Sequence, residues 1–348
     1  MKLTTHLICI FTSLLASHLM AGDMPIQTGK GHHFACTDYS GGKVFIVNTD
    51  GKVEWEYKTG SCNDLWVLPN GNLLFNTGTG VQEVTRDKKI VFDYKGSPFK
   101  RAVKQLDDTM KLQLQSSLLQ PERTVKQKDG TTKQVESPSE IYACQRLANG
   151  NTFIGECNTG RLLVVTPAGK IVKEVRLLSE GKDGGHAFIR NARVLANGNF
   201  LVTHYAEESV REYDPQGKLV RDIPAKGGPH SAVRLPNGNT LIAIGDRPDG
   251  HRVFEVDAAG KTVWEVKDGD LPGLPLKFMT GVQRLPNGNT VITNWLGHNQ
   301  FGKSAHIIEL TPEKKVVWTF ADHKTMKTVS SIQLLDVPGD CTKGEIQH

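Results

Sequence analysis

The stretch Leu285-Pro286-Asn287-Gly288-Asn289 decides the fold, because the chain repeats it at intervals. Copies of it, complete or with Ala in place of Pro, begin at Leu68, Leu147, Leu195, Leu235 and Leu285, and a degenerate copy begins at Leu335. The steps from one Leu to the next are 79, 48, 40, 50 and 50 residues. Periods of this size are typical of a repeat architecture.

Each copy is predicted to be a hairpin turn. Alternating apolar residues end at the Leu, as in Ser231 to Leu235, and resume at the last Asn, as in Asn239 to Ile244. Pro presets φ for the turn, and Gly takes the left-handed position that closes a three-residue hairpin. We therefore expect the Leu and the last Asn to face each other across two strands.

A second alternating pair follows in each unit. Val253 to Val256 is joined to Thr262 to Glu265 by the turn sequence Asp257 to Lys261. Four short strands per unit at this period predict an all-β fold, a β-propeller with four-stranded antiparallel blades.

The count of units predicts six blades. The first blade is split: its innermost strand comes from Ser331 to Leu335, and its other three come from Phe34 to Tyr57. Pairing the two ends of the chain closes the ring and removes a free sheet edge. Seven blades remain an alternative if the long insertion at about 95–139 contains one.

The first 21 residues are predicted to be a signal peptide. Lys2 gives a positive start, an apolar run extends from Leu7 to Leu19, and Ala21 is a suitable cleavage point. We expect the remainder, 22–348, to form a single propeller domain that is secreted or periplasmic. No other segment is apolar enough to span a membrane. The formal charge of +5 is mild for this length and favours no nucleic-acid partner.

The insertion at about 95–139 accounts for the 79-residue step. It is dense in Lys and Gln, and two readings compete. Val103, Leu106 and Met110 could form one stripe of a short helix, and residues 123–136 could form a protruding hairpin with Asp129-Gly130 at its tip. We interpret it as a solvated excursion between blades 2 and 3. The alternative is an arm that binds a protein partner.

Five cysteines lie beyond the signal peptide, at positions 36, 62, 144, 157 and 341. An odd number leaves at least one free in an oxidising compartment. Cys36 with Cys62 is the pair most worth testing for a disulfide; the alternative is that all five are buried, small apolar residues. No Cys-x-x-Cys is present, which disfavours a thiolate zinc site.

The candidate site lies at the end of the blades away from the Pro-Asn-Gly turns. There the innermost strands converge on the channel mouth, where propellers bind ligands. Counting outward from each turn, the residue five before the Leu should face the residue nine after it. This places at the mouth Tyr142 facing Glu156, Arg190 facing His204, His230 facing Ile244, and Thr280 facing Asn294. Asn191, Asp246 and Trp295 are the neighbouring candidates in the same blades. The turn end repeats one sequence, whereas this end differs in every blade, as one asymmetric site requires.

His204, His230 and Arg190 are the candidate catalytic residues. A histidine beside an arginine can act as a base or nucleophile next to an anion clamp. The candidate ligand-binding residues are Tyr142, Glu156, Asn191, Asp246, Asn294 and Trp295. No cofactor is predicted, but histidines and carboxylates from different blades could also hold a divalent metal. The alternatives are structural: Tyr142 with Glu156 as a cross-strand pair, and Trp295 as packing between blades.

The units resemble those of secreted propellers grouped as quinoprotein-like (PQQ-like) and arylsulfotransferase-like repeats. The resemblance rests on the Leu-Pro-Asn-Gly-Asn hairpins and on Gly-Lys-x-x-Trp turns, here Gly51 to Trp55 and Gly260 to Trp264. Quinoprotein dehydrogenases have eight blades and adjacent cysteines, so bound quinone is not implied. Arylsulfotransferases use a histidine nucleophile at the channel mouth, which the resemblance assigns to His230, or to His204.

The sequence thus predicts a secreted propeller that binds a small polar or anionic, carbohydrate-like ligand at the channel mouth. Two alternatives remain. One is an enzyme of the arylsulfotransferase-like or sugar lyase or hydrolase type that uses a mouth histidine. The other is a protein-interaction scaffold.

Overall fold

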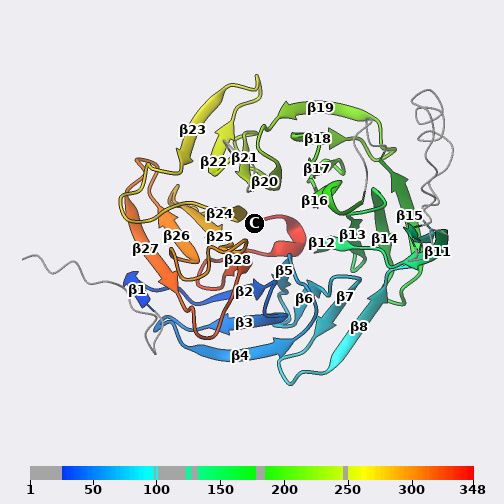
Figure 1. The fold of residues 1–348 in the computed structure, drawn as a ribbon, viewed down its shortest axis with the longest axis horizontal. Helices are drawn as coiled ribbons and strands as arrows, with labels where there is room; N and C mark the ends of the chain where they lie inside the picture. Colours follow the sequence, from blue (N-terminus) through cyan, green and yellow to red (C-terminus); the bar gives the residue numbers. More distant parts are fainter. Residues whose placement is uncertain (1–25, 98, 101–122, 127–131, 178–184, 246–249) are drawn as a thin grey trace, which may run out of the picture.

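Six antiparallel sheets, five of four strands and one of five, stand in a ring in the computed structural model (Figure 1). The structure describes residues 26–97, 99–100, 123–126, 132–177, 185–245 and 250–348. The predicted signal peptide, Asp246 and the tip Asp129-Gly130 lie outside these residues. The prediction of an all-β, six-bladed propeller is confirmed.

The strands of each blade run outward from the channel. Blade 1 consists of β28 (Val329–Leu334), β2 (Phe34–Asp38), β3 (Lys43–Val47) and β4 (Val53–Lys58). Blade 2 consists of β5 (Leu65–Val67), β6 (Leu73–Asn76), β7 (Gly80–Val84) and β8 (Ile90–Lys95). Blade 3 consists of β12 (Ile141–Arg146), β13 (Thr152–Glu156), β14 (Arg161–Val165) and β15 (Ile171–Arg176). Blade 4 consists of β16 (Ile189–Val194), β17 (Phe200–His204), β18 (Ser209–Tyr213) and β19 (Leu219–Pro224). Blade 5 consists of β20 (Pro229–Arg234), β21 (Thr240–Ile244), β22 (Arg252–Val256) and β23 (Thr262–Lys267). Blade 6 contains β24 (Met279–Arg284), β25 (Thr290–Asn294), β26 (Ile307–Leu310) and β27 (Val316–Ala321).

Ring closure follows the prediction. β28 from the C-terminal part of the chain pairs with β2, with Phe34 opposite Leu334 and Cys36 opposite Ile332. A further strand, β1 (Ile26–Gly29), pairs with β27 and gives blade 6 a fifth strand. No repeat position marks this segment, so the sequence did not predict it.

The insertion does not form a seventh blade in its described residues. β10 (Arg123–Lys126) and β11 (Thr132–Ser137) pair as a hairpin, as predicted, and β9 (Phe99–Lys100) adds to β11. The three strands form a small sheet of their own. The described part of the chain also contains no helix long and apolar enough to span a membrane.

The turns have the predicted geometry. In all five, the Leu N–H donates to the carbonyl of the last Asn at 2.8–2.9 Å. The Gly of the turn has φ between 83° and 87°, as at Gly238 and Gly288, a left-handed region that glycine enters without steric cost.

Each turn also joins its blade to the next. Asn239 Nδ2 donates to Glu255 Oε1 at 2.6 Å, and Arg284 from blade 6 donates to Glu255 Oε2 at 2.7 Å. The same Asn–Glu–Arg clamp joins blades 2 to 3 and 4 to 5. At the closure of the ring His32 replaces the arginine and lies 2.9 Å from Glu309. Because the partners come from different blades, the clamps fix the blade order.

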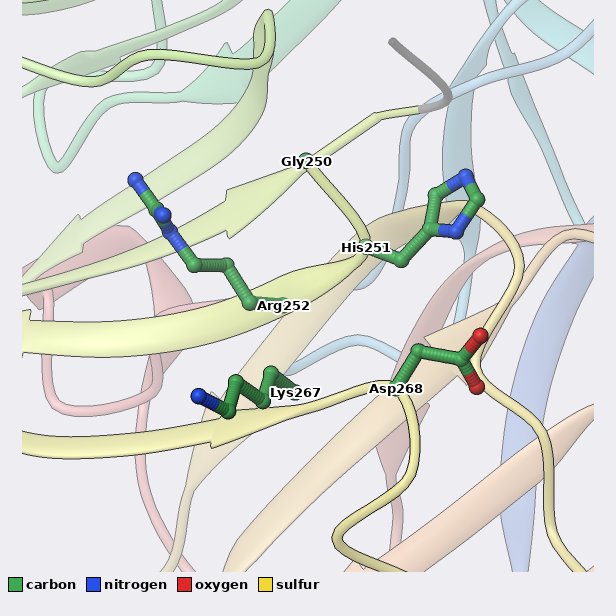
Figure 2. A pocket seen from close by; sticks show the side chains of 5 residues that line it. All are labelled: Gly250, His251, Arg252, Lys267 and Asp268. Carbon is green, nitrogen blue, oxygen red and sulfur yellow. The ribbon is translucent and has the colours of Figure 1, made fainter. Parts of the chain in front are cut away.

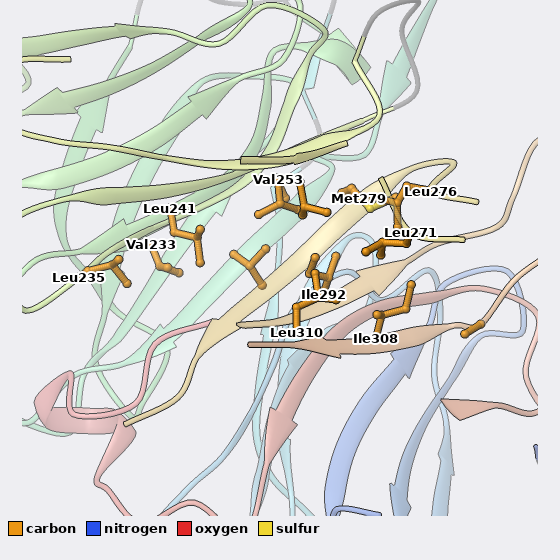
Figure 3. Packing of buried hydrophobic residues seen from close by; sticks show 14 residues of the cluster. Val233, Leu235, Leu241, Val253, Leu271, Leu276, Met279, Ile292, Ile308 and Leu310 are labelled. Atoms are coloured by element: carbon orange, nitrogen blue, oxygen red, sulfur yellow. The ribbon is translucent and has the colours of Figure 1, made fainter. Parts of the chain in front are cut away.

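The apolar core lies between neighbouring blades. Figure 3 shows the cluster between blades 5 and 6, where Val233, Leu241 and Val253 face Met279 and Ile292. The tryptophans of the Gly-Lys-x-x-Trp turns add a polar contact: Trp55 Nε1 and Trp264 Nε1 donate to backbone carbonyls of the following blade at 2.8 Å. That motif therefore has an architectural role.

The five cysteines that the structure describes are free and buried. Cys36 does not bond to Cys62, so the disulfide raised from the sequence is wrong. Cys36 Sγ instead lies 4.0 Å from Met326 Sδ, and Cys62 Sγ donates to the Asp64 carbonyl. Burial raises the pKa of both thiols, which keeps them neutral and unreactive.

The outer hairpins offer a test of local strain. Lys314 has φ of 66°, at a turn position where the equivalent Gly260 has 85°. Because a side chain in this region is strained, Lys314→Gly is expected to raise the free energy of unfolding by about 1 kcal/mol. Gly260→Ala, where an added Cβ meets nothing within 4 Å, should lower it by a similar amount. Urea denaturation measures both, and equal stabilities of all three proteins would contradict the argument.

Candidate functional site

A β-bulge recurs where the two innermost strands of a blade approach the channel mouth. Ile141 faces Glu156, Ile189 faces His204 and Pro229 faces Ile244, each followed by a shift in register. The predicted pairs of Tyr142 with Glu156, Arg190 with His204, His230 with Ile244 and Thr280 with Asn294 are therefore wrong by one residue. A bulge sets two residues opposite one and re-aims the extra side chain.

Threonines hold the bulge in three blades. The hydroxyl oxygens of Thr203, Thr293 and Thr37 accept from the N–H groups of Asn191, Gly281 and Ser331 at 2.6–3.0 Å. These N–H groups would otherwise lack a ladder partner. The bulge is therefore built into the repeat.

Arg190, on the bulge of blade 4, lies between two aromatic rings. Its guanidinium carbon is 5.1 Å from the centre of the Tyr142 ring and 4.8 Å from that of Tyr205. Its Nη1 lies 3.3 Å from His186 Nε2. Cation–π contacts of this kind hold the guanidinium plane in one orientation.

His186 completes this cluster and was not among the predicted site residues. It lies in the short 3-10 turn η1 (Gly185–Ala187), which has no counterpart in the repeat. Its Nδ1 is 2.7 Å from Glu140 Oε2 and 3.1 Å from the Tyr142 hydroxyl. The ring therefore bridges a carboxylate and an arginine at the channel mouth.

Two other groups of the cluster stay neutral near pH 7. Burial raises the pKa of Tyr142 far above its usual range, and burial raises the pKa of Cys157 to about 12. Cys157 Sγ contacts the His186 carbonyl at 3.1 Å. The charge of this cluster therefore resides on Arg190 and Glu140, with His186 between them.

A second aromatic group lies beside the first. The centre of the Phe278 ring lies 5.3 Å from that of His230, which it meets edge-on, and 5.0 Å from that of Trp295. The ring centres of Trp295 and His298 are 5.0 Å apart. The Tyr39 ring lies 6.1 Å from Trp295, and its hydroxyl lies 3.5 Å from that of Tyr142. The structure thus brings Tyr142, Arg190, His230 and Trp295 to one end of the channel.

Glu156 and Asn294 have other partners. Both Glu156 oxygens accept from Arg161, at 2.7 and 2.8 Å, and the side chain is fully buried. Asn294 Oδ1 accepts from the Lys277 and Phe278 N–H groups, which fixes the chain as it enters blade 6. Asn76 does the same in blade 2. These contacts stabilise the individual blades.

His204 is buried inside blade 4. Its Nε2 lies 2.8 Å from the Tyr213 hydroxyl, and its ring packs against Phe188. Burial, helped by the charge of Arg211, lowers the pKa of His204 to about 3. Asn191, beside it, is also buried, and its Oδ1 has no hydrogen-bond partner among the described residues.

The C-terminal residues enter the channel, which the sequence did not predict. Figure 1 shows the chain end at the centre of the ring, after the 3-10 turn η2 (Cys341–Lys343). The buried His348 ring lies 4.1 Å from that of Trp66, and its carbonyl accepts from Arg193 at 2.7 and 3.1 Å. The segment starts near the turn end, where Cys341 contacts the Val67 carbonyl. It therefore lies among the innermost strands, below the mouth.

A surface pocket lies on blade 5, apart from these clusters (Figure 2). Gly250, His251, Arg252, Lys267 and Asp268 line it. Asp268 is already paired with Lys277 at 3.0 Å. None of the predicted site residues that the structure describes lines this pocket. Among the described residues, no group of three or more His, Cys, Asp or Glu side chains is arranged to hold a metal ion.

Several solved structures have a fold similar to that of this chain. No family model matches the chain, and no curated protein matches it. A protein of unknown function from Bacteroides caccae is 25% identical with a TM-score of 0.68, over 87% of this chain and 98% of that one. A streptogramin B lyase is 14% identical with a TM-score of 0.52, over 85% and 87%. A catalytically inactive histidine-to-alanine variant of virginiamycin B lyase from Staphylococcus aureus, with quinupristin, is 14% identical with a TM-score of 0.51, over 86% and 99%. At 14% identity the lyases share the propeller fold with this chain, and the likeness extends no further.

Proposed function

We propose that the protein binds a small anionic, carbohydrate-like ligand at the channel mouth, with Arg190 as the contact for the acidic group. The observation that carries this proposal is the environment of Arg190. No carboxylate in the described part of the chain pairs with it, and its Nε atom has no hydrogen-bond partner there. By contrast Arg161, Arg193 and Arg211 each lie 2.6–2.7 Å from a carboxylate oxygen.

A half-buried guanidinium without a carboxylate partner is suited to an anion. Its planar N–H groups match the oxygens of a carboxylate, sulfate or phosphate. The Tyr142 and Tyr205 rings fix its plane, so little conformational entropy is lost when the anion binds. Glu140 is the nearby negative charge, and His186 lies between it and Arg190.

The contact of His186 with Glu140 favours a second candidate, an enzyme that transfers a proton at the same mouth. A carboxylate 2.7 Å from Nδ1 fixes one tautomer and leaves Nε2 as the basic nitrogen. His186 is exposed, whereas His204 is fully buried. A sugar lyase or hydrolase needs such a base.

Replacing Arg190 tests the proposal. Arg190→Met should weaken the binding of glucuronate about 10- to 100-fold, because one charge-assisted contact is lost. Arg190→Lys should recover only part of the affinity, since it keeps the charge without the planar fork. Arg176→Met, at an exposed arginine of blade 3, is the matched control and should bind normally. Isothermal titration calorimetry measures the affinities, and melting temperatures report folding.

Two results would separate the candidates. Unchanged binding in Arg190→Met would reject the anion contact. Conversion of an acidic oligosaccharide by the wild type, lost in His186→Asn, would establish the enzyme; recovery of the intact ligand would establish binding without turnover.

A further inference from the structure

The loop after β25 carries unusual backbone strain beside the mouth. Leu296, His298 and Asn299 have φ of 59°, 49° and 66°, all in the left-handed region. A non-glycine residue there costs about 1–2 kcal/mol. Strain of this kind persists where the surrounding structure enforces it, and it gathers at binding sites.

The strained loop positions the Trp295 ring. A Cβ on Gly297 would lie 1.9 Å from the Trp295 Cζ3 atom, so the ring rests directly on the Gly297 backbone. Phe278, His298 and Tyr39 meet the ring at 65–78°, so none of these three stacks parallel to it. Trp295 is half-buried, so part of the residue is open to solvent.

Aromatic rings connect Trp295 to Arg190 along two routes. One passes through Tyr39 and Tyr142, whose hydroxyls are 3.5 Å apart. The other passes Gly245, where an added Cβ would lie 2.6 Å from the Phe278 ring and 3.0 Å from that of Tyr205. A side chain at Gly245 would push these two rings away. Arg190 and Trp295 are therefore linked by ring contacts at the same end of the propeller.

We infer that Trp295 forms a second subsite at the same mouth as Arg190, so that the ligand is an acidic oligosaccharide of at least two sugars. The acidic sugar contacts Arg190, and a neighbouring neutral pyranose packs its C–H face on the indole. Trp suits this role because it offers a large apolar surface at little cost in conformational entropy. The inference rests on the proposed function, because it needs the acidic group at Arg190.

Comparing one sugar with two tests the inference. The probes are glucuronate and a disaccharide of glucuronate linked to glucose. In the wild type the disaccharide should bind at least about tenfold more tightly than glucuronate. In Trp295→Ala this gain should disappear while the affinity for glucuronate stays unchanged. Arg190→Met should weaken both probes.

The control is Phe301→Ala, which removes an exposed aromatic side chain from the segment that follows Trp295. It should leave both affinities unchanged. If Trp295→Ala has a lowered melting temperature, Trp295→Leu keeps the apolar volume and should still lose the gain. Equal affinity of the wild type for the two probes, or a gain retained in both variants, would overturn the second subsite. Failure of the wild type to bind either probe would overturn the proposed function itself.

Discussion

Between pH 6.5 and pH 4.5 the free energy of unfolding is expected to fall by about 5 kcal/mol, because His204 and His306 stay neutral in the folded protein. Burial is the main cause that lowers the pKa of each to about 3. Unfolding returns each pKa to about 6.5. The unfolded chain therefore binds more protons as the pH falls, and each histidine contributes about 1.4 kcal/mol per pH unit.

The groups around these histidines support this direction. His204 faces Tyr213 and Phe188, and the Glu207 carboxylate, 3.7 Å away, pairs with Arg211 at 2.6 Å. The Nδ1 atom of His306 accepts from the Asp322 N–H group, and its ring lies 4.5 Å from that of His323. The pKa of His348 is also lowered by burial and by Arg193, so it adds to the loss.

One histidine acts in the opposite direction. Burial lowers the pKa of His32, but hydrogen bonds to Glu309 and Asp336 outweigh it and raise the pKa above its usual value. Its contribution is present below pH 6.5 and is lost as the pH rises through the raised pKa. His32→Arg, which restores the arginine found in the other clamps, should remove this loss at high pH.

Urea denaturation at pH 7, 6, 5 and 4.5 measures the effect. His204→Gln keeps a hydrogen-bonding group near the Tyr213 hydroxyl but cannot titrate. Its free energy of unfolding should depend on pH less steeply than that of the wild type. The difference in slope should correspond to about one bound proton. A slope equal to that of the wild type would show that His204 is protonated in the folded state.

The parts of the fold that depend on local sequence could be predicted. Gly238 and Gly288 lie in turns whose hydrogen bonds span five residues, so the local sequence is enough to determine the geometry of these turns. The split first blade followed from counting these turns. β1 could not be predicted, because its pairing with β27 joins segments almost 300 residues apart and has no repeat position.

The candidate site was predicted less well, for a physical reason. Register was counted from the turn, and one bulge between the turn and the mouth shifts every later pair. Tyr142 and Arg190 still reach the mouth because they are the bulged residues, whereas Glu156 is held by Arg161. His186 lies outside the repeat, so the count from the turn assigned it no facing residue. The clustering of unlike residues at one end was the signal that led to the proposed face.

The position of the C-terminal segment could not be predicted from the sequence either. Its contacts lead to the second large effect on stability. Arg193 is 3% exposed on its side chain and Asp64 is 0% exposed, and they lie 2.7 Å apart across the channel. Arg193 also donates to the His348 carbonyl and lies over the Trp66 ring. One guanidinium therefore links blade 2, blade 4 and the C-terminal segment.

Arg193→Met is expected to lower the free energy of unfolding by about 3–5 kcal/mol, because it leaves Asp64 buried without its ion pair. Burial already raises the pKa of Asp64, and Arg193 opposes that shift. Without Arg193 the carboxyl should take up a proton more readily, so the loss relative to the wild type should shrink from pH 8 to pH 5. The double variant Asp64→Leu with Arg193→Met removes both charges and should recover much of the stability, since replacing a buried pair by apolar groups is often nearly neutral. Denaturation curves of the three proteins decide the matter: if the double variant is no more stable than Arg193→Met, the loss comes from the contacts with His348 and Trp66 rather than from the buried charge of Asp64.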